Sequence, residues 1–203
     1  ATFTPGRDAA RKEASKLNVP RIGVRFRLPA SMNQVEYFGR GPAENYLDRN
    51  AGSMIGLYKS TAEELYFPYV RPQENGHHTD TRWVSLSTGK KGLLIQADNT
   101  IGFNALRNSI EDFDDEEATG LPRQWSNFTP EQVANHDEAA AKNVLRRQHH
   151  INDITPRDFV EVCVDLKQQG VAGYDSWGSR PEPAYTLPAN REYNWGFTLI
   201  PLK

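Results

Sequence analysis

The amino-acid sequence predicts an all-β fold, an antiparallel β-sandwich that carries one short helix. Several segments alternate apolar and polar residues with a period of two, which is typical of half-buried strands. Turns rich in glycine and proline separate these segments, and a single stretch carries clear signals for the start of a helix. Many short strands with one helix favour a sandwich of antiparallel strands over the other fold classes.

Two segments show the clearest alternation. In residues 21–28 the apolar face consists of Ile22, Val24, Phe26 and Leu28, and Pro29 ends the strand. In residues 159–167 the apolar face consists of Val160, Val162, Val164 and Leu166. Shorter patterns predict further strands at residues 34–39, 54–59, 83–86, 93–95, 101–106 and 193–199, with Gly-Lys-Lys-Gly at residues 89–92 as a hairpin turn.

The one predicted helix begins at Thr129. Thr129 suits the N-cap, Pro130 the first helical position and Gln132 the third position of a capping box. The apolar stripe in residues 133–144 predicts that this helix lies on a sheet. A separate acidic run at residues 111–117 lacks the glycine and ligand spacing of a calcium loop, so it is predicted to be a solvated loop.

Composition narrows the classes of partner. The chain has 203 residues, of which 37% are hydrophobic and 25% charged, and its net charge is -2. No basic field favours nucleic acid or an anionic membrane, and no apolar run is long enough for a transmembrane helix. The single cysteine, Cys163, lies in a predicted strand and is interpreted as packing. We expect residues 1–18 to be a linker or terminal segment and residues 19–203 to form one domain.

Residues 68–81 are predicted to form a long polar loop. Two prolines stiffen it, and Asn75-Gly76 is a strong turn dipeptide. Its candidate binding residues are Glu74, Asn75, His77 and His78, with an ordinary solvated connection as the alternative. Adjacent histidines on a strand point to opposite faces and no third ligand has suitable spacing, so no metal site is predicted.

A second candidate loop, residues 170–180, contains Trp177 between Ser176 and Gly178. A tryptophan in a glycine-rich turn is more often exposed than one in a strand, and an exposed indole face can bind the apolar face of a sugar ring. The alternative is that Trp177 packs under its own loop, because tryptophan is on average highly buried. Asp175 lies in the same turn and is a further candidate for sugar binding.

Four motifs in order carry a family resemblance. They are Val-Pro-Arg-Ile-Gly at residues 19–23, Tyr-Phe-Gly-Arg-Gly-Pro-Ala-Glu-Asn-Tyr at 37–46, Pro-Tyr-Val-Arg-Pro-Gln-Glu-Asn-Gly at 68–76, and Asp-Ser-Trp-Gly at 175–178. Together they resemble the C-terminal domain of large bacterial β-galactosidases of glycoside hydrolase family 2. The resemblance spans nearly the whole chain from Val19.

The resemblance implies a fold and a role. The fold is a β-supersandwich of the galactose mutarotase-like kind. The catalytic pair of glutamates belongs to a separate barrel domain that is absent here, so no catalytic residue is expected in this chain. Trp177 is expected to stack on the aglycone sugar, and residues 71–81 to border the active site and move on ligand binding. The implied partners are a galactoside or acceptor sugar, the barrel domain, and further copies of the complete enzyme.

The resemblance implies no cofactor in this chain, although the complete bacterial enzyme, cytoplasmic or periplasmic, can require Mg²⁺ and Na⁺. Ala172 and Tyr174 stand where the family usually has glycine and an acidic or amide residue, so Tyr174 is expected to narrow the aglycone site. Two other functions compete with this one. The histidine-bearing loop allows a free-standing epimerase that uses a histidine acid and an acidic base. A purely structural module that fixes oligomer contacts is the third reading.

Overall fold

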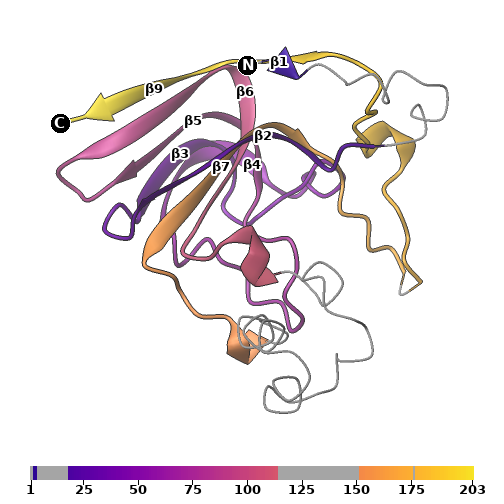
Figure 1. The fold of residues 1–203 in the computed structure, drawn as a ribbon, viewed down its shortest axis with the longest axis horizontal. Helices are drawn as coiled ribbons and strands as arrows, with labels where there is room; N and C mark the ends of the chain where they lie inside the picture. Colours follow the sequence, from indigo (N-terminus) through magenta and orange to yellow (C-terminus); the bar gives the residue numbers. More distant parts are fainter. Residues whose placement is uncertain (1, 4–17, 114–150, 176) are drawn as a thin grey trace, which may run out of the picture.

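The chain is an antiparallel all-β protein, which confirms the predicted fold class. The computed structural model describes residues 2–3, 18–113, 151–175 and 177–203 (Figure 1). These residues form nine strands and three short 3-10 helices. The strands are β1 (Thr2–Phe3), β2 (Arg21–Pro29), β3 (Gln34–Gly41), β4 (Met54–Thr61), β5 (His78–Ser87), β6 (Gly92–Leu106), β7 (Phe159–Gln168), β8 (Tyr193–Asn194) and β9 (Phe197–Leu202). The 3-10 helices are η2 (Ile110–Phe113), η4 (Ile151–Asp153) and η5 (Pro183–Tyr185).

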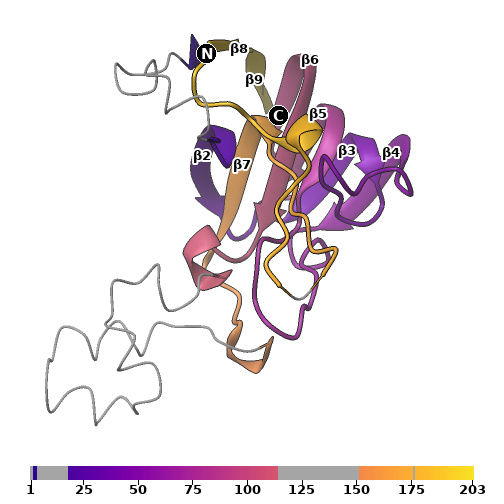
Figure 2. The ribbon, with the colours of Figure 1, turned by 90° about the vertical axis from the view of Figure 1, so that its right-hand side faces the viewer.

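One large sheet dominates the structure. Its strands follow the order β2-β7-β6-β5-β3-β4, and Figure 2 shows them side by side in that order. The long strand β6 has two partners besides β5. Its first part, from Gly92 to Ala97, pairs with β9, and its last part, from Gly102 to Leu106, pairs with β7. β1 and β8 form a separate two-stranded sheet. The arrangement is consistent with a β-sandwich.

The predicted strands are largely confirmed, with three differences. Residues 93–95 and 101–106 are one strand rather than two, because β6 continues through the intervening polar residues. The predicted strand at residues 193–199 is divided at Trp195-Gly196, between β8 and β9. Within the acidic run, Asp112 is buried and binds Arg157, so the prediction of a solvated loop is wrong at that residue. The predicted helix and residues 114–117 lie outside the described residues.

The core lies along one face of the large sheet. It is built from the inward residues of β3, β5, β6 and β7, with contributions from the connecting loops. Tyr37, His78 and Phe103 form an aromatic group in which each pair of ring centroids is 5.0 Å apart. Cys163 is buried and burial raises the pKa of its thiol to about 12, which agrees with its interpretation as packing.

Both histidines of the predicted polar loop are buried, which corrects part of that prediction. Residues 68–77 are a connection, but β5 begins at His78, so residues 78–81 belong to the sheet. His77 and His78 are only 2% and 0% exposed. The His77 ring stacks on Tyr46, and its Nδ1 lies 2.9 Å from Asn104 Oδ1. Gly102 makes room for that ring, because a Cβ there would lie 2.5 Å from the ring's Cε1 atom.

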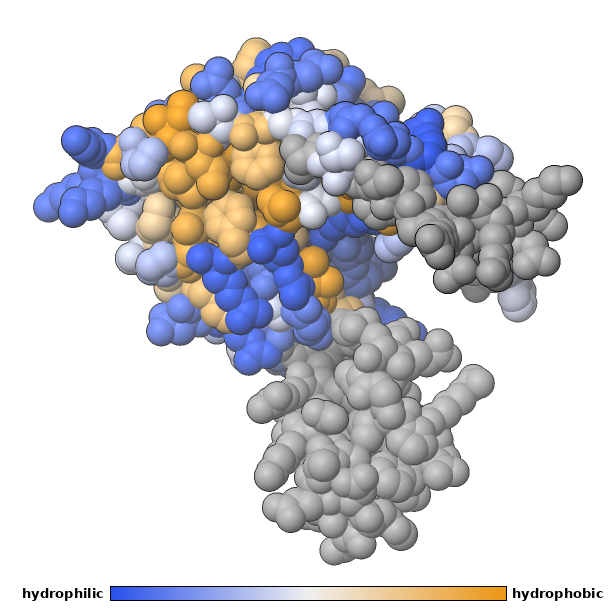
Figure 3. All heavy atoms as spheres, turned by 45° about the horizontal axis from the view of Figure 1, so that its top comes forward, coloured by the Kyte–Doolittle hydropathy of each residue, from blue (hydrophilic) through white to orange (hydrophobic). Residues whose placement is uncertain are grey.

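The surface also carries apolar side chains. Figure 3 shows one face of the molecule, on which apolar side chains form a patch bordered by hydrophilic residues. Exposed large apolar residues on the strands are Val24, Met54, Ile55, Leu57, Leu199 and Leu202. Patches of this kind mark contact surfaces in proteins. No helix within the described residues is long and apolar enough to cross a membrane.

Truncation of the core aromatic group is expected to destabilise the chain strongly. Phe103→Ala should lower the free energy of unfolding by about 3–5 kcal/mol, because it removes a fully buried ring and leaves a cavity between Tyr37 and His78. Phe67→Ala is the matched control, since Phe67 is 47% exposed, and it should cost less than about 1 kcal/mol. Urea unfolding followed by circular dichroism measures both. Equal losses in the two variants would contradict this account of the core.

The burial of His77 predicts a pH dependence of stability. Burial lowers the pKa of His77 from 6.5 to about 3, and the nearby Arg21 charge acts in the same direction. As the pH falls, the unfolded chain therefore binds a proton at His77 before the folded chain does. The contribution of neutral His77 to the free energy of unfolding is complete above pH 6.5 and is lost as the pH falls toward 3.

His77→Gln is the comparison that isolates this effect, because other titrating groups remain in both chains. Between pH 7 and pH 5 the wild type should lose about 2 kcal/mol of unfolding free energy relative to the variant. Urea unfolding at the two pH values measures the difference. A constant difference would show that His77 does not titrate as its burial requires.

Candidate functional site

Residues 41–49, at the end of β3 and in its connection to β4, lie against the loop that precedes β5. Glu44 Oε2 accepts a hydrogen bond from Gly76 N at 2.7 Å, and Asn45 N donates to His77 O at 2.7 Å. Asn45 Oδ1 accepts from both Thr79 N (3.0 Å) and Thr79 Oγ1 (2.6 Å). Two of the sequence motifs are therefore joined directly, and the 41–49 segment determines the path of the loop.

Glu44 is a buried carboxylate with several donors around it. Its side chain is 4% exposed, and it accepts hydrogen bonds from Tyr46 Oη (3.2 Å), Arg49 Nη2 (2.7 Å) and Tyr69 Oη. A buried charge is tolerated only when it is paired and hydrogen-bonded in this way. Because Glu44 also accepts a hydrogen bond from Gly76 N, it stabilises the Asn75-Gly76 turn. The positive φ of Gly76, 70°, confirms the predicted turn.

Glu74 and Asn75 are occupied by contacts within the chain. Glu74 Oε1 lies 3.0 Å from Arg21 Nη2, and that guanidinium also binds Asn104 Oδ1 at 2.9 Å. The Asn75 side chain is buried and forms two hydrogen bonds with the backbone of Phe67, at 2.8 and 2.6 Å. Both predicted site residues therefore shape the loop through contacts within the chain.

Arg21 also pairs with a buried acid. Its Nε lies 3.1 Å from Asp165 Oδ2, and its Nη2 donates to Gln168 Oε1 at 2.5 Å. Burial raises the pKa of Asp165 to about 7, although the charge of Arg21 acts in the opposite direction. This group of side chains joins β2, β7 and the loop that carries Glu74.

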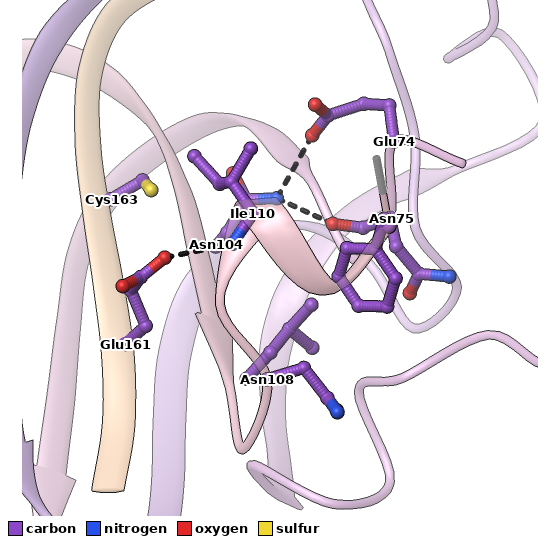
Figure 4. Close-up of a pocket in the computed structure, with 9 residues that line it drawn as sticks. Glu74, Asn75, Asn104, Asn108, Ile110, Glu161 and Cys163 are labelled. Atoms are coloured by element: carbon purple, nitrogen blue, oxygen red, sulfur yellow. Dashed lines mark hydrogen bonds between the residues drawn. The ribbon is translucent and has the colours of Figure 1, made fainter. Parts of the chain in front are cut away.

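A cavity of about 150 Å³ lies beside Glu74. Figure 4 shows Asn104 donating toward Glu74 and the backbone of Asn75, with Glu161 on the opposite wall. Glu161 accepts from Ile110 N at 2.9 Å and from Arg27 Nε at 3.0 Å. The two acids of the cavity are therefore each paired with an arginine.

Trp177 lies in a loop that backbone donors and side-chain acceptors hold in place. Asp48 Oδ1 and Oδ2 accept from the backbone N–H groups of Val171 (3.0 Å) and Ala172 (2.8 Å). Ser179 Oγ accepts from the next two, Gly173 N and Tyr174 N, at 3.2 and 3.1 Å. Asp175 Oδ1 accepts from Trp177 N at 2.8 Å. These acceptors are spaced along the whole turn.

The indole of Trp177 is 93% exposed, as the glycine-rich turn predicts. Tyr174 in the same turn is 59% exposed. The carboxylate of Asp175 binds Trp177 N, so in this conformation it orients the turn. Among the residues that the structure describes, no hydrogen bond joins the turn that carries Trp177 (residues 170–180, the Trp177 turn) to residues 74–78. The 41–49 segment contacts both.

The three acceptors of that segment, Glu44, Asn45 and Asp48, were not singled out from the sequence as functional. The first two lie in the motif Gly-Pro-Ala-Glu-Asn-Tyr at residues 41–46, which carries polar residues in a predicted loop, and Asp48 lies two residues after it. Their distant partners lie 32 to 124 positions away along the chain, as with Gly76 N for Glu44, Thr79 for Asn45 and Ala172 N for Asp48, so local pattern could not find them.

The histidines offer no accessible acid or metal site. Both rings are buried, and burial lowers the pKa of His78 as it does that of His77. Within residues 2–3, 18–113, 151–175 and 177–203, no group of three or more His, Cys, Asp or Glu side chains is arranged to hold a metal ion.

Comparison with known proteins places the chain among β-galactosidases. The family model described as "Beta galactosidase small chain" matches residues 3–199. A β-galactosidase of Priestia megaterium is 35% identical over 185 residues, which cover 91% of this chain and 15% of that protein. One of Arthrobacter is 40% identical over 111 residues (52% and 11%), and one of Vibrio cholerae is 29% identical over 181 residues (89% and 14%).

The chain thus spans at most 15% of the length of these relatives, while they match most of its own length in two of the three cases. The family match runs from the first strand into the last one. On this evidence, the chain belongs to the β-galactosidase small-chain family.

Proposed function

We propose that this chain is the C-terminal domain of a bacterial β-galactosidase and that Trp177 forms a wall of the site for the aglycone sugar. The observation that carries the proposal is the 93% exposure of an indole on a turn whose backbone is held by Asp48, Ser179 and Asp175. An exposed aromatic face binds the C–H face of a sugar ring. A turn that is already ordered loses little entropy when the sugar binds.

The proposal assigns the chemistry to another part of the enzyme. A retaining glycosidase needs two carboxyl groups about 5–5.5 Å apart, one as nucleophile and one as acid and base. In this chain Glu74 and Glu161 are paired with arginines, and Glu44 is buried under four hydrogen bonds. As the family resemblance implies, the proposal assigns the catalytic glutamates to the barrel domain of the complete enzyme and gives this chain the role of a binding wall.

The loop that carries Glu74 has a supporting role in this proposal. Glu74, Asn75, His77 and His78 fix its backbone through the contacts described above, and its exposed side chains include Phe67 and Val70, at 47% and 80%. Exposed apolar side chains on an ordered loop suit contact with a neighbouring domain. The partner we propose for this surface is the barrel domain. Any Mg²⁺ or Na⁺ of the complete enzyme is assigned to ligands outside the described residues.

Substitution of Trp177 tests the binding role. In the complete enzyme Trp177→Ala should weaken the binding of an acceptor sugar such as glucose by about 1–3 kcal/mol, the usual cost of truncating an aromatic contact. Trp177→Phe should retain part of the affinity because it keeps an aromatic face. The acceptor dependence of galactosyl transfer measures the affinity. Unchanged acceptor binding in Trp177→Ala would remove the role assigned to this residue.

The isolated chain tests the division of roles. It should show no release of nitrophenol from nitrophenyl β-galactoside above buffer, because the proposal assigns the catalytic glutamates to the barrel domain. It should also fail to speed the mutarotation of fresh α-galactose measured by polarimetry, because both histidines are buried. Turnover of the galactoside by this chain would contradict the proposal, and faster mutarotation would favour the epimerase instead.

A further inference from the structure

We infer that Asp48 is the positioning residue for Trp177 and so determines the affinity of the aglycone site. The inference rests on the proposed function and deepens it. Asp48 does not contact the sugar in this account. It acts on the sugar through the backbone of the turn that carries the indole.

The contact is bidentate and comes from a distant part of the chain. The two carboxylate oxygens of Asp48 each accept one backbone N–H, from Val171 at 3.0 Å and Ala172 at 2.8 Å. Charged acceptors form stronger hydrogen bonds to backbone N–H groups than neutral ones do. The other two acceptors of the turn, Ser179 and Asp175, belong to the turn itself. Asp48 is therefore the acceptor that ties the turn to the sheet.

The backbone that Asp48 binds has an unfavourable conformation. Ala172 has φ of 54° and the next residue, Gly173, has φ of 88°. The left-handed region is costly for a residue with a Cβ atom, so Ala172 stays there only when its surroundings hold it. The hydrogen bond from Ala172 N to the carboxylate provides that restraint at the residue that needs it.

Gly170 leaves the space that the carboxylate occupies. A Cβ atom at Gly170 would lie 2.4 Å from Asp48 Oδ2, which is too close for any side chain. The turn therefore begins with a residue whose lack of a side chain admits the carboxylate, and continues with two donors aimed at it. The absence of a side chain at Gly170 and the carboxylate of Asp48 are therefore complementary in shape.

The same segment also holds the other loop. Glu44 and Asn45 bind Gly76 N and Thr79, while Asp48 binds the Trp177 turn. The orientation of the two loops relative to each other thus depends on residues 41–49. Loss of Asp48 frees the Trp177 turn and leaves the bonds of Glu44 and Asn45 in place, so its effect can be separated from a general loss of the site.

The experiment uses the complete enzyme and compares acceptor affinity in Asp48→Asn with that in the wild type. Asparagine has the same shape but one acceptor oxygen, and its NH₂ group would face a backbone N–H. The expected loss of glucose affinity, measured by galactosyl transfer, is about tenfold. Gly170→Ala is expected to give a similar loss, because it displaces the carboxylate from the opposite side. Asp158→Asn is the matched control at an exposed aspartate, and it should change nothing.

A double-mutant cycle separates positioning from a general structural effect. If Asp48 acts through the indole, Asp48→Asn should reduce acceptor affinity no further in a Trp177→Ala background. Additive losses in the double variant would overturn the inference. The inference would also be overturned if Asp48→Asn kept the acceptor affinity of the wild type while Trp177→Ala weakened it. That result would leave the proposed function in place. Unchanged binding in Trp177→Ala itself would overturn the proposed function, which keeps the two failures distinct.

Discussion

The structure depends on the satisfaction of backbone N–H groups in two long loops by side chains of residues 41–49. Loops cannot form the ladders of a sheet, so each buried N–H must find another acceptor or lose free energy comparable to a hydrogen bond. Glu44 and Asp48 provide acceptors for Gly76, Val171 and Ala172 in the two loops, and Asn45 provides one for Thr79 at the start of β5. The segment begins at the end of β3 and lies in the connection to β4, so the order of the sheet extends to both loops.

The strands could be predicted because their signal is local. Alternation in residues 21–28 and 159–167 follows directly from the pleat, and both segments form strands close to the predicted bounds. The prediction was weaker where tertiary packing overrides composition. His77 and His78 lie in a run rich in prolines and polar residues, which reads as a solvated loop. They are buried because Tyr46 stacks on one ring while Tyr37 and Phe103 pack around the other.

The candidate site could likewise be predicted only where its signal was local. Trp177 was singled out from its glycine-rich turn, and its exposure follows from the same local signal. The positions of Glu74 and Asn75 were also noted, but their partners Arg21, Asn104 and Phe67 come from distant segments and decide what these side chains do. A pattern shows which residues are polar. It does not show whether a polar atom faces a ligand or another part of the chain.

The position of the exposed indole must come from its backbone. A side chain that is 93% exposed makes few packing contacts, so the core cannot orient it. Its direction is set by the turn, and the turn is set by acceptors that bind the N–H groups of residues 171–174 and of Trp177. Of these acceptors only Asp48 is connected to the large sheet through an independent segment. A local cap can preserve the shape of a turn but cannot preserve its orientation relative to the rest of the molecule. The orientation of Trp177 is therefore a property of the contact between Asp48 and the turn, and so is any function that requires its indole to face a particular direction.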